Sequence, residues 1–272
     1  MPRGAWRLAL AVGLIVAALR PGPSARADDC PAPPIVDLAL HLRDGLGADN
    51  VFGVPESEVH WVFYPVTQDR ALPADFGPAD LVRTSTGSAP QGAMSVRRLI
   101  VPELDAMFAA ARADSVVLGI VSGYRSYDSQ AALFDAAVRQ RVAQGTDRAD
   151  AEARVNHFRA RPGHSQHQLG TTVDLTSPEA GNGLGLRFAQ THAAEWVRAH
   201  ASEYGFVIPY TELSEPYTGY ANEPWHIRWV GHDLAALMMA DDYLDHANPT
   251  ADDYLVALDA LLAGTLAGCT PG

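Results

Sequence analysis

The stretch RPGHSQHQLGTTVDL, residues 161–175, places His167, Gly170 and Asp174 at the spacing H-x-x-G-x-x-x-D. Asp174 lies within a β-prone Thr-Thr-Val-Asp-Leu run, so we expect a strand to carry it. Gly170 lets the backbone turn tightly before that strand, because glycine tolerates conformations closed to other residues. Two explanations fit the pattern: a metal site with an imidazole and a carboxylate as ligands, or an ordinary polar turn that enters a strand.

A second stretch, NEPWHIRWVG at residues 222–231, offers a third ligand. Pro224 excludes an ordinary helix interior, so this is not the helical H-E-x-x-H arrangement of many zinc peptidases. His226 is the candidate ligand, and Glu223 is a carboxylate left free for proton transfer. Trp225 must point differently from its neighbour in an extended segment, and we expect it to pack behind His226.

A third stretch, SGYRSYDSQ at residues 122–130, follows a predicted strand and precedes a predicted helix. Arg125 emerges on the loop between them. A guanidinium at such a point can hold a substrate carboxylate in a bidentate grip, or it can offset the oxyanion of a tetrahedral intermediate.

Each stretch alone has an ordinary explanation as a surface hydrogen-bonded pair, a short chance match or a solvated arginine. Together they supply the parts of a hydrolytic zinc site. Such a site has three nitrogen or oxygen ligands, an open position for water, and a carboxylate that is not a ligand. The sequence therefore predicts a hydrolase that holds one Zn²⁺ per chain.

The periodicity of apolar residues predicts a single α+β domain over residues 96–272. We expect helices at 102–112, 126–143, 187–202, 232–244 and 251–266, and strands at 116–121, 206–208 and 227–230. Residues 28–95 are rich in Pro, Gly, Asp and Ser, with a β-like run at 59–63. We interpret them as an irregular N-terminal arm packed on the core.

Residues 1–27 have the layout of a secretory signal peptide: early arginines, an apolar run, and a small-x-small site at Ala25-Arg26-Ala27. The apolar run from Leu8 to Leu19 is too short to span a bilayer, which needs about 20 residues. No later stretch of the sequence predicts a transmembrane segment. We therefore expect a secreted, extracytoplasmic protein that is cleaved near Ala27.

The net charge and the cysteine content further restrict the functional class of the protein. The net charge is −12, and removal of residues 1–27 takes away four arginines and no acidic residue, which gives −16. A chain this acidic lacks the basic footprint of a nucleic-acid-binding protein. The two cysteines, Cys30 and Cys269, can form a disulfide between the tails in an oxidising compartment, the alternative being two unpaired thiols.

The three stretches share their order and spacing with one known family. The shared motifs are Ser122-Gly-Tyr-Arg-Ser126 with Gln130, Ser165-x-His167-x-x-Gly170-x-x-x-Asp174, and Glu223-Pro-Trp-His226 with Arg228 and Gly231. On these motifs the chain resembles the VanY-type zinc D-alanyl-D-alanine carboxypeptidases, over about residues 72–231. The resemblance implies the fold shared with the Hedgehog signalling domain, in which a small antiparallel sheet carries the zinc site and helices flank it.

By the same resemblance, zinc is bound by His167, Asp174 and His226. Glu223 is implied to be the catalytic base and Arg125 to stabilise the transition state. The residues implied to contact substrate or to support the site are Ser165, Gln130, Tyr124 and Trp225.

The function implied is hydrolysis of the terminal D-Ala-D-Ala bond of peptidoglycan stem peptides. A cation must meet the substrate's carboxylate, and the candidates are Arg125, Arg159, Arg161 and Arg228. An L,D-carboxypeptidase or an endopeptidase on stem peptides would use the same chemistry on another bond. A zinc-stabilised binding module without activity is an alternative of another class, although it would not need Glu223 and Arg125. The remaining alternative is a structural domain whose motifs are incidental.

Overall fold

The computed structural model describes residues 33–46, 56–84 and 94–263. Its helices are α2 (Pro33–Leu46), α3 (Glu56–Phe63), α4 (Val101–Ala113), α5 (Tyr127–Ala143), α6 (Arg148–Phe158), α7 (His192–His200), α8 (Glu215–Thr218), α9 (His232–Ala240) and α10 (Ala251–Leu262). Its strands are β1 (Leu81–Thr84), β2 (Met94–Arg97), β3 (Gly119–Ser122), β4 (Thr172–Thr176), β5 (Phe206–Val207) and β6 (His226–Trp229). Short 3₁₀ turns are η2 (Arg98–Ile100), η3 (Gln166–Leu169), η4 (Phe188–Gln190), η5 (Ala201–Tyr204) and η6 (Tyr243–Asp245).

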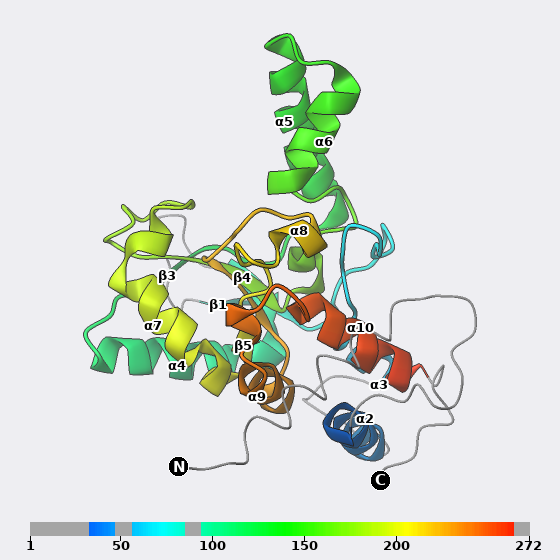
Figure 1. The fold of residues 1–272 in the computed structure, drawn as a ribbon, viewed down its shortest axis with the longest axis vertical. Helices are drawn as coiled ribbons and strands as arrows, with labels where there is room; N and C mark the ends of the chain where they lie inside the picture. The colour runs from blue at the N-terminus through cyan, green and yellow to red at the C-terminus, as the bar shows by residue number, and fades with distance from the viewer. Residues whose placement is uncertain (1–32, 47–55, 85–93, 264–272) are drawn as a thin grey trace.

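A four-stranded antiparallel sheet in the order β3–β4–β6–β5 lies at the centre of the fold (Figure 1). Its register places Asp174 on β4 opposite His226 on β6, and opposite Ser122 on β3. A separate antiparallel pair, β1–β2, lies outside this sheet. The predicted α+β fold with a small antiparallel sheet and flanking helices is confirmed.

The two faces of β4 differ because successive side chains of a strand point to opposite sides. Val173 and Leu175 are fully buried in the main hydrophobic core, together with Ile120 of β3 and Ile227 of β6. Asp174 therefore projects from the other face, away from this core. Burial of the apolar face fixes the register, since a slip of one residue would put the carboxylate into the core.

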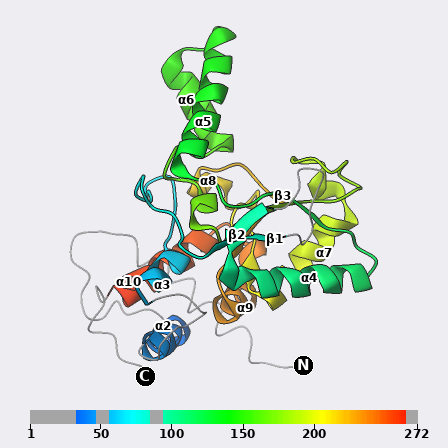
Figure 2. The same ribbon diagram turned by 180° about the vertical axis from the view of Figure 1, so that it is seen from behind.

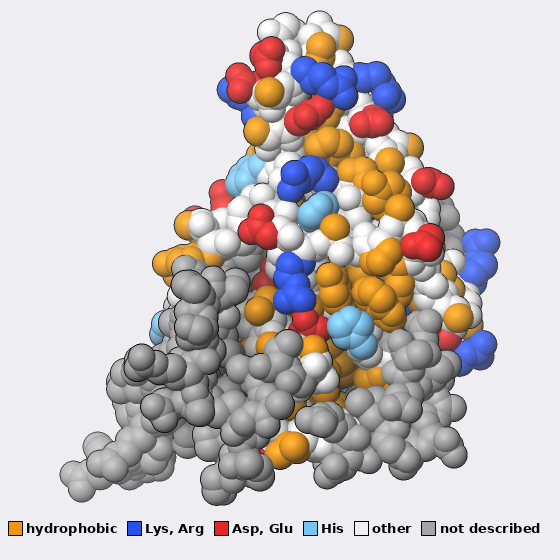
Figure 3. Space-filling view, turned by 90° about the vertical axis from the view of Figure 1, so that its right-hand side faces the viewer, with side chains coloured by type: hydrophobic (Ala, Val, Ile, Leu, Met, Phe, Trp, Pro, Cys, Tyr) orange, Lys and Arg blue, Asp and Glu red, His pale blue; other side chains and the backbone are white. Residues whose placement is uncertain are grey.

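Helices α5 and α6 form a hairpin that rises away from the rest of the molecule in both ribbon views (Figures 1 and 2). Ser126 caps α5 by accepting a hydrogen bond from the Ser129 amide, and Asp147 caps α6 in the same way. The hairpin has a small core of its own, formed by Phe134, Val138, Ala151 and Val155. Acidic and basic side chains mix on its surface at the top of Figure 3.

The sequence prediction for the N-terminal arm is wrong in two places. Residues 33–46 and the β-like run 59–63 are helical, in α2 and α3. Val59, Val62 and Phe63 are buried, at the i, i+3, i+4 spacing of one helical face, and both helices pack against α10. Packing against a third helix overrides the β propensity of the Val and aromatic residues.

The other predicted elements are present with shifted ends. The strand expected at 116–121 is β3 at 119–122, because its partner β4 ends at Thr176, which pairs with Gly119. The helix expected at 187–202 begins only after Thr191, whose side chain accepts a hydrogen bond from the Ala194 amide. Thr250 caps α10 in a reciprocal capping box with Asp253.

Two sequence predictions fall outside the described residues. The signal peptide at 1–27 and both members of the predicted disulfide, Cys30 and Cys269, lie there. Within the described part of the chain, no helix has both the length and the apolar character needed to cross a bilayer.

Candidate metal centre

Three side chains from separate elements meet at the open face of the sheet. His167 lies in η3, Asp174 in the middle of β4, and His226 at the start of β6. Gly170 ends η3 with φ 73°, a left-handed conformation that favours glycine. A Cβ at this position would lie 2.9 Å from Arg97 Cγ, so both conformation and space require glycine here.

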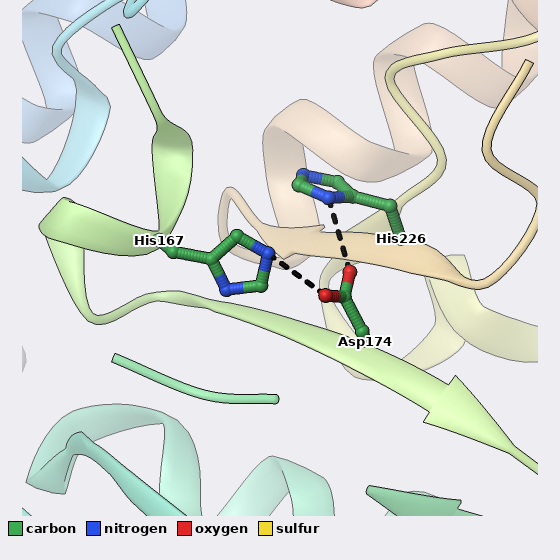
Figure 4. A group of neighbouring side chains, drawn as sticks. All are labelled: His167, Asp174 and His226. Atoms are coloured by element: carbon green, nitrogen blue, oxygen red, sulfur yellow. Dashed lines mark ion pairs between the residues drawn. The ribbon is translucent and has the colours of Figure 1, made fainter. Parts of the chain in front are cut away.

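Each carboxylate oxygen of Asp174 faces one imidazole (Figure 4). His167 Nε2 is 3.1 Å from Asp174 Oδ2, and His226 Nδ1 is 3.2 Å from Oδ1. The three potential ligand atoms all lie within 4.8 Å of one another, and all three residues are buried. Despite the approach of His226 Nδ1, Asp174 Oδ1 makes no hydrogen bond among the described residues, and such a buried oxygen calls for a ligand.

The other nitrogen of each ring faces a protein acceptor. His167 Nδ1 is 2.8 Å from the Gly123 carbonyl oxygen, and His226 Nε2 is 3.2 Å from Gln166 Oε1. A proton on these outer nitrogens leaves His167 Nε2 and His226 Nδ1 free to bind a cation. Two imidazole nitrogens and one carboxylate oxygen are a donor set that suits Zn²⁺.

The protonation states of the ligands agree with metal binding. Burial lowers the pKa of His226 to about 4 despite the neighbouring Asp174, so this ring is neutral at pH 7. Burial alone would raise the pKa of Asp174, but the two imidazoles hold it well below its usual range. The site therefore presents a neutral His226 imidazole and an ionised Asp174 carboxylate, the forms in which these residues bind metals.

Glu223 lies beside the three ligands without belonging to their cluster. Its Oε2 is 3.4 Å from His226 Nδ1, and its side chain is one-fifth exposed to the cleft. Burial raises the pKa of Glu223 to about 8, the charge of Asp174 adds to the effect, and Arg125 and Arg159 oppose it. Carboxyls with a pKa raised towards neutrality are typical of catalytic acids and bases.

Arg125 reaches the same point from the loop after β3. Its Nη1 donates to Gln130 Oε1 at 2.7 Å and its Nη2 to Ser122 Oγ at 3.0 Å. Nη2 also lies 3.7 Å from Asp174 Oδ2. These bonds hold the guanidinium at the rim of the ligand cluster.

A cleft of about 290 Å³ opens over this group. Among the predicted substrate contacts, Ser165, Gln130 and Trp225 line it, and Trp225 also packs into the main core. Tyr124 is not among the described residues that line the cleft, and a Cβ added at Gly77 would lie 3.3 Å from its hydroxyl, so its contact with substrate stays a prediction.

Sequence analysis missed several residues of the cleft. Tyr210 contacts the His226 ring, with ring centroids 5.0 Å apart, and Tyr220 packs against Tyr210. Leu133 and Phe158 come from the α5–α6 hairpin and Leu184 from the loop after β4. None of these residues lies in one of the three motifs. Gln166 also lines the cleft, and its position next to His167 is the one sequence feature that could have indicated a role for it.

Asp252 of α10 is a second buried carboxyl close to the cleft, and sequence analysis also missed it. Burial raises its pKa to about 7 against the attraction of Arg228, and Asp253 adds to the effect. Because the folded pKa lies above the ordinary value, this group stabilises the fold below about pH 4. That contribution is lost as the pH rises through about 7.

We therefore expect Asp252→Asn to gain stability relative to the wild type as the pH rises from about 4 to about 7, and to change little above. The expected gain is a few kcal/mol, because each pKa unit corresponds to about 1.4 kcal/mol. Urea unfolding of both proteins with chelator present, at several pH values, measures the difference. A difference independent of pH would show that Asp252 is ionised in the fold throughout this range.

Comparison with known proteins gives a consistent result. The family model described as "VanY: D-alanyl-D-alanine carboxypeptidase" matches residues 93–232. A D-alanyl-D-alanine carboxypeptidase of Enterococcus faecalis is 33% identical over 211 residues, which are 75% of this chain and 73% of that protein. The putative carboxypeptidase YodJ of Bacillus subtilis is 34% identical over 180 residues, which are 65% of this chain and 63% of YodJ.

Two solved structures are also similar. One is a mutant of the vancomycin resistance D,D-pentapeptidase VanY from a VanB-type cassette in complex with Zn(II), with 30% identity and a TM-score of 0.55 over 65% of this chain and 93% of that one. The other is the LD-carboxypeptidase LdcB, with 32% identity and a TM-score of 0.61 over 71% of this chain and 88% of that one.

Proposed function

Because this chain belongs to the VanY family of zinc-dependent D-alanyl-D-alanine carboxypeptidases, we propose that it removes the terminal D-alanine from peptidoglycan stem peptides ending in D-Ala-D-Ala. The observation that carries the proposal is the buried His167–Asp174–His226 cluster with Glu223 beside it and outside it. When bound there, Zn²⁺ would lower the pKa of a coordinated water towards neutrality and polarise the scissile carbonyl.

Glu223 is the residue we assign to proton transfer. Its carboxyl borders the cleft next to the ligand cluster, where it can accept a proton from the attacking water and return it to the leaving amine. A base must be ionised to take up a proton, and a cation bound at the adjacent cluster would oppose the rise in the pKa of Glu223 that burial causes. Ser165, Gln130 and Trp225 line the same cleft, and we assign them to substrate contact or support.

We assign Arg125 to stabilisation of the oxyanion of the tetrahedral intermediate, because its guanidinium lies beside the carboxylate ligand Asp174.

The C-terminal carboxylate of the substrate then needs another cation. Arg228 is fully buried and donates to the carbonyl oxygens of Val62 and Tyr64, so it is not available. Arg161 donates to the Gln68 carbonyl and does not line the cleft. Arg159 donates from Nη1 to the Leu133 carbonyl and does line the cleft. Arg159 is therefore our candidate for the terminal carboxylate.

Arg125→Ala is expected to lower kcat by about 10²–10³-fold, the usual effect of removing an oxyanion donor, with zinc content unchanged. Arg125→Lys should recover little, because a lysine cannot reproduce the paired bonds to Ser122 and Gln130. Arg139→Ala, at an exposed position of α5, is the matched control with wild-type kinetics. Steady-state D-alanine release measures all three, and a change confined to KM would move Arg125 from the oxyanion to substrate binding.

The overall proposal is tested on the purified protein by elemental mass spectrometry and by D-alanine release from a pentapeptide ending in D-Ala-D-Ala. We expect one zinc per chain and release that chelator abolishes. Zinc without release from any stem peptide would favour a zinc-stabilised binding module. A protein that binds no zinc would overturn the proposal.

L,D-carboxypeptidase activity is the second candidate, favoured by the similarity to LdcB. The same site would then cleave a tetrapeptide that ends in a single D-alanine. Parallel assays on pentapeptide, tetrapeptide and crosslinked dimer, with product masses, separate this activity and an endopeptidase from the D,D activity. Release faster from the tetrapeptide than from the pentapeptide would replace the D,D assignment.

We also propose that the protein acts outside the cytoplasm after cleavage near Ala27, and that Cys30 and Cys269 form a disulfide there. The arrangement of residues 1–27 supports the first part and the even cysteine count the second. N-terminal sequencing of protein recovered from the cell envelope or medium tests the cleavage. Mass spectrometry of the alkylated protein with and without reduction tests the disulfide.

A further inference from the structure

A chain of buried polar side chains leads from His226 away from the proposed metal position. His226 Nε2 is 3.2 Å from Gln166 Oε1, and Gln166 Nε2 donates to Asp252 Oδ1 at 3.1 Å. Gln166 and His226 are 1% and 4% exposed, and Asp252 is 6% exposed. Gln166 lies in η3, His226 in β6 and Asp252 in α10, so these polar contacts connect α10 to the sheet.

The direction of the Gln166 amide decides which nitrogen of His226 is free. An amide has an acceptor on one side and a donor on the other, and it can turn over. With Oε1 towards the ring, it accepts a proton from Nε2 and leaves Nδ1 free on the side of Asp174. If the amino group of Gln166 points towards the ring instead, it must donate to a lone pair on His226 Nε2. The ring proton then lies on Nδ1, where it prevents cation binding.

Asp252 favours the first arrangement. Asp252 Oδ1 accepts from the amino group of Gln166, and this pairing turns Gln166 Oε1 towards His226. We propose that Asp252 is a positioning residue, which acts through Gln166 to hold His226 with Nδ1 free for the metal. This inference rests on the proposed role of His226 as a zinc ligand.

The location of Asp252 supports this role. Its helix lies beyond residues 93–232, the part of the chain that matches the family model. On α10 its neighbours Leu255 and Leu258 are apolar and enter the main core, while Arg228 and Asp253 are the charged groups that act on it. Burial of a carboxyl in such surroundings costs free energy. The hydrogen bond from Gln166 to Asp252 offers a functional reason for a carboxyl at this position.

Asp252→Leu keeps the branched shape and removes the acceptor. In the zinc-bound protein the amino group of Gln166 would then be buried without a partner, whereas in the zinc-free protein the amide can turn over and donate to His226. Asp252→Leu therefore destabilises the zinc-bound protein and leaves the stability of the zinc-free protein unaffected by the loss of this hydrogen bond. We expect the Kd for zinc, measured by competition with a chromogenic chelator, to rise about 10–100-fold, with kcat at saturating zinc little changed.

Asp252→Asn is the conservative rescue. Its amide oxygen can accept from Gln166, so we expect a zinc Kd within about threefold of the wild type. The alternative role of Asp252 is to balance the buried charge of Arg228. That role needs the charge itself, so it predicts equal weakening in the asparagine and leucine variants, and that outcome would overturn the proposal.

Two further comparisons keep the test decisive. Asp259 lies on the same helix, is also 6% exposed and bonds to Arg70, so Asp259→Leu should lower stability while the zinc Kd stays within about twofold. Gln166→Leu should weaken zinc binding, and adding Asp252→Leu to it should weaken binding no further, because the two residues act in series. If Asp252→Leu does not fold, Asp252→Ala takes its place with the same expected loss.

Two results would exclude the proposed action of Asp252 through Gln166, provided that the wild type binds zinc. One is additive effects of Gln166→Leu and Asp252→Leu on the zinc Kd, and the other is an unchanged Kd in Asp252→Leu. A wild type that binds no zinc would instead exclude the proposed function. The two failures are therefore distinguishable from the same titration.

Discussion

Glu223→Gln is expected to lower D-alanine release by about 10²–10⁴-fold, the range contributed by a positioned acid or base, with one zinc still bound per chain. Glutamine keeps the shape of the side chain but cannot take up the proton of the attacking water. The ligand cluster consists of His167, Asp174 and His226 and does not include Glu223. Loss of the carboxylate should therefore remove proton transfer and leave the metal in place.

The measurement combines zinc content by elemental mass spectrometry with steady-state kinetics on the pentapeptide. Glu212→Gln, which changes an exposed carboxyl outside the lining of the cleft, is the matched control and should keep both zinc and activity. Loss of zinc from Glu223→Gln would identify Glu223 as a ligand. Activity near the wild-type level would remove it from the mechanism altogether.

The site was predictable because its parts stand in short local patterns. His167 and Asp174 are separated by one turn with an obligatory glycine, and a single β ladder then pairs Asp174 with His226. The family prediction is confirmed, and the fold class with it. The roles assigned to Glu223, Arg125 and the ligands stay predictions until the variants are measured.

Other features depend on contacts that no local pattern contains. Residues 59–63 carry a strand-like composition, and their helical form buries apolar side chains in a core to which the distant α10 contributes. Asp252 follows His226 by a helix and a 3₁₀ turn, and the packing of α10 alone brings it to Gln166. Tyr210 reaches His226 from the loop after β5, which no spacing rule predicts.

His226→Ala is expected to abolish both zinc binding and hydrolysis. Its Nδ1 is one of only two imidazole nitrogens in the cluster, and without it Asp174 and His167 would have to hold the ion alone. Structural and catalytic zinc sites use at least three protein ligands, so the remaining pair is not sufficient.

Thermal unfolding with and without zinc gives the clearest measurement of this loss. For the wild type, free zinc at a thousand times Kd should add about 4 kcal/mol to the stability of the fold, and Tm should rise accordingly. For His226→Ala, zinc should leave Tm unchanged. His164→Ala is the matched control, because His164 lines the same cleft and bonds to the Thr67 carbonyl outside the ligand cluster. A zinc-dependent Tm in His226→Ala would mean that the ion is held elsewhere, and the pairing of Asp174 with His226 across the sheet would then be a structural contact.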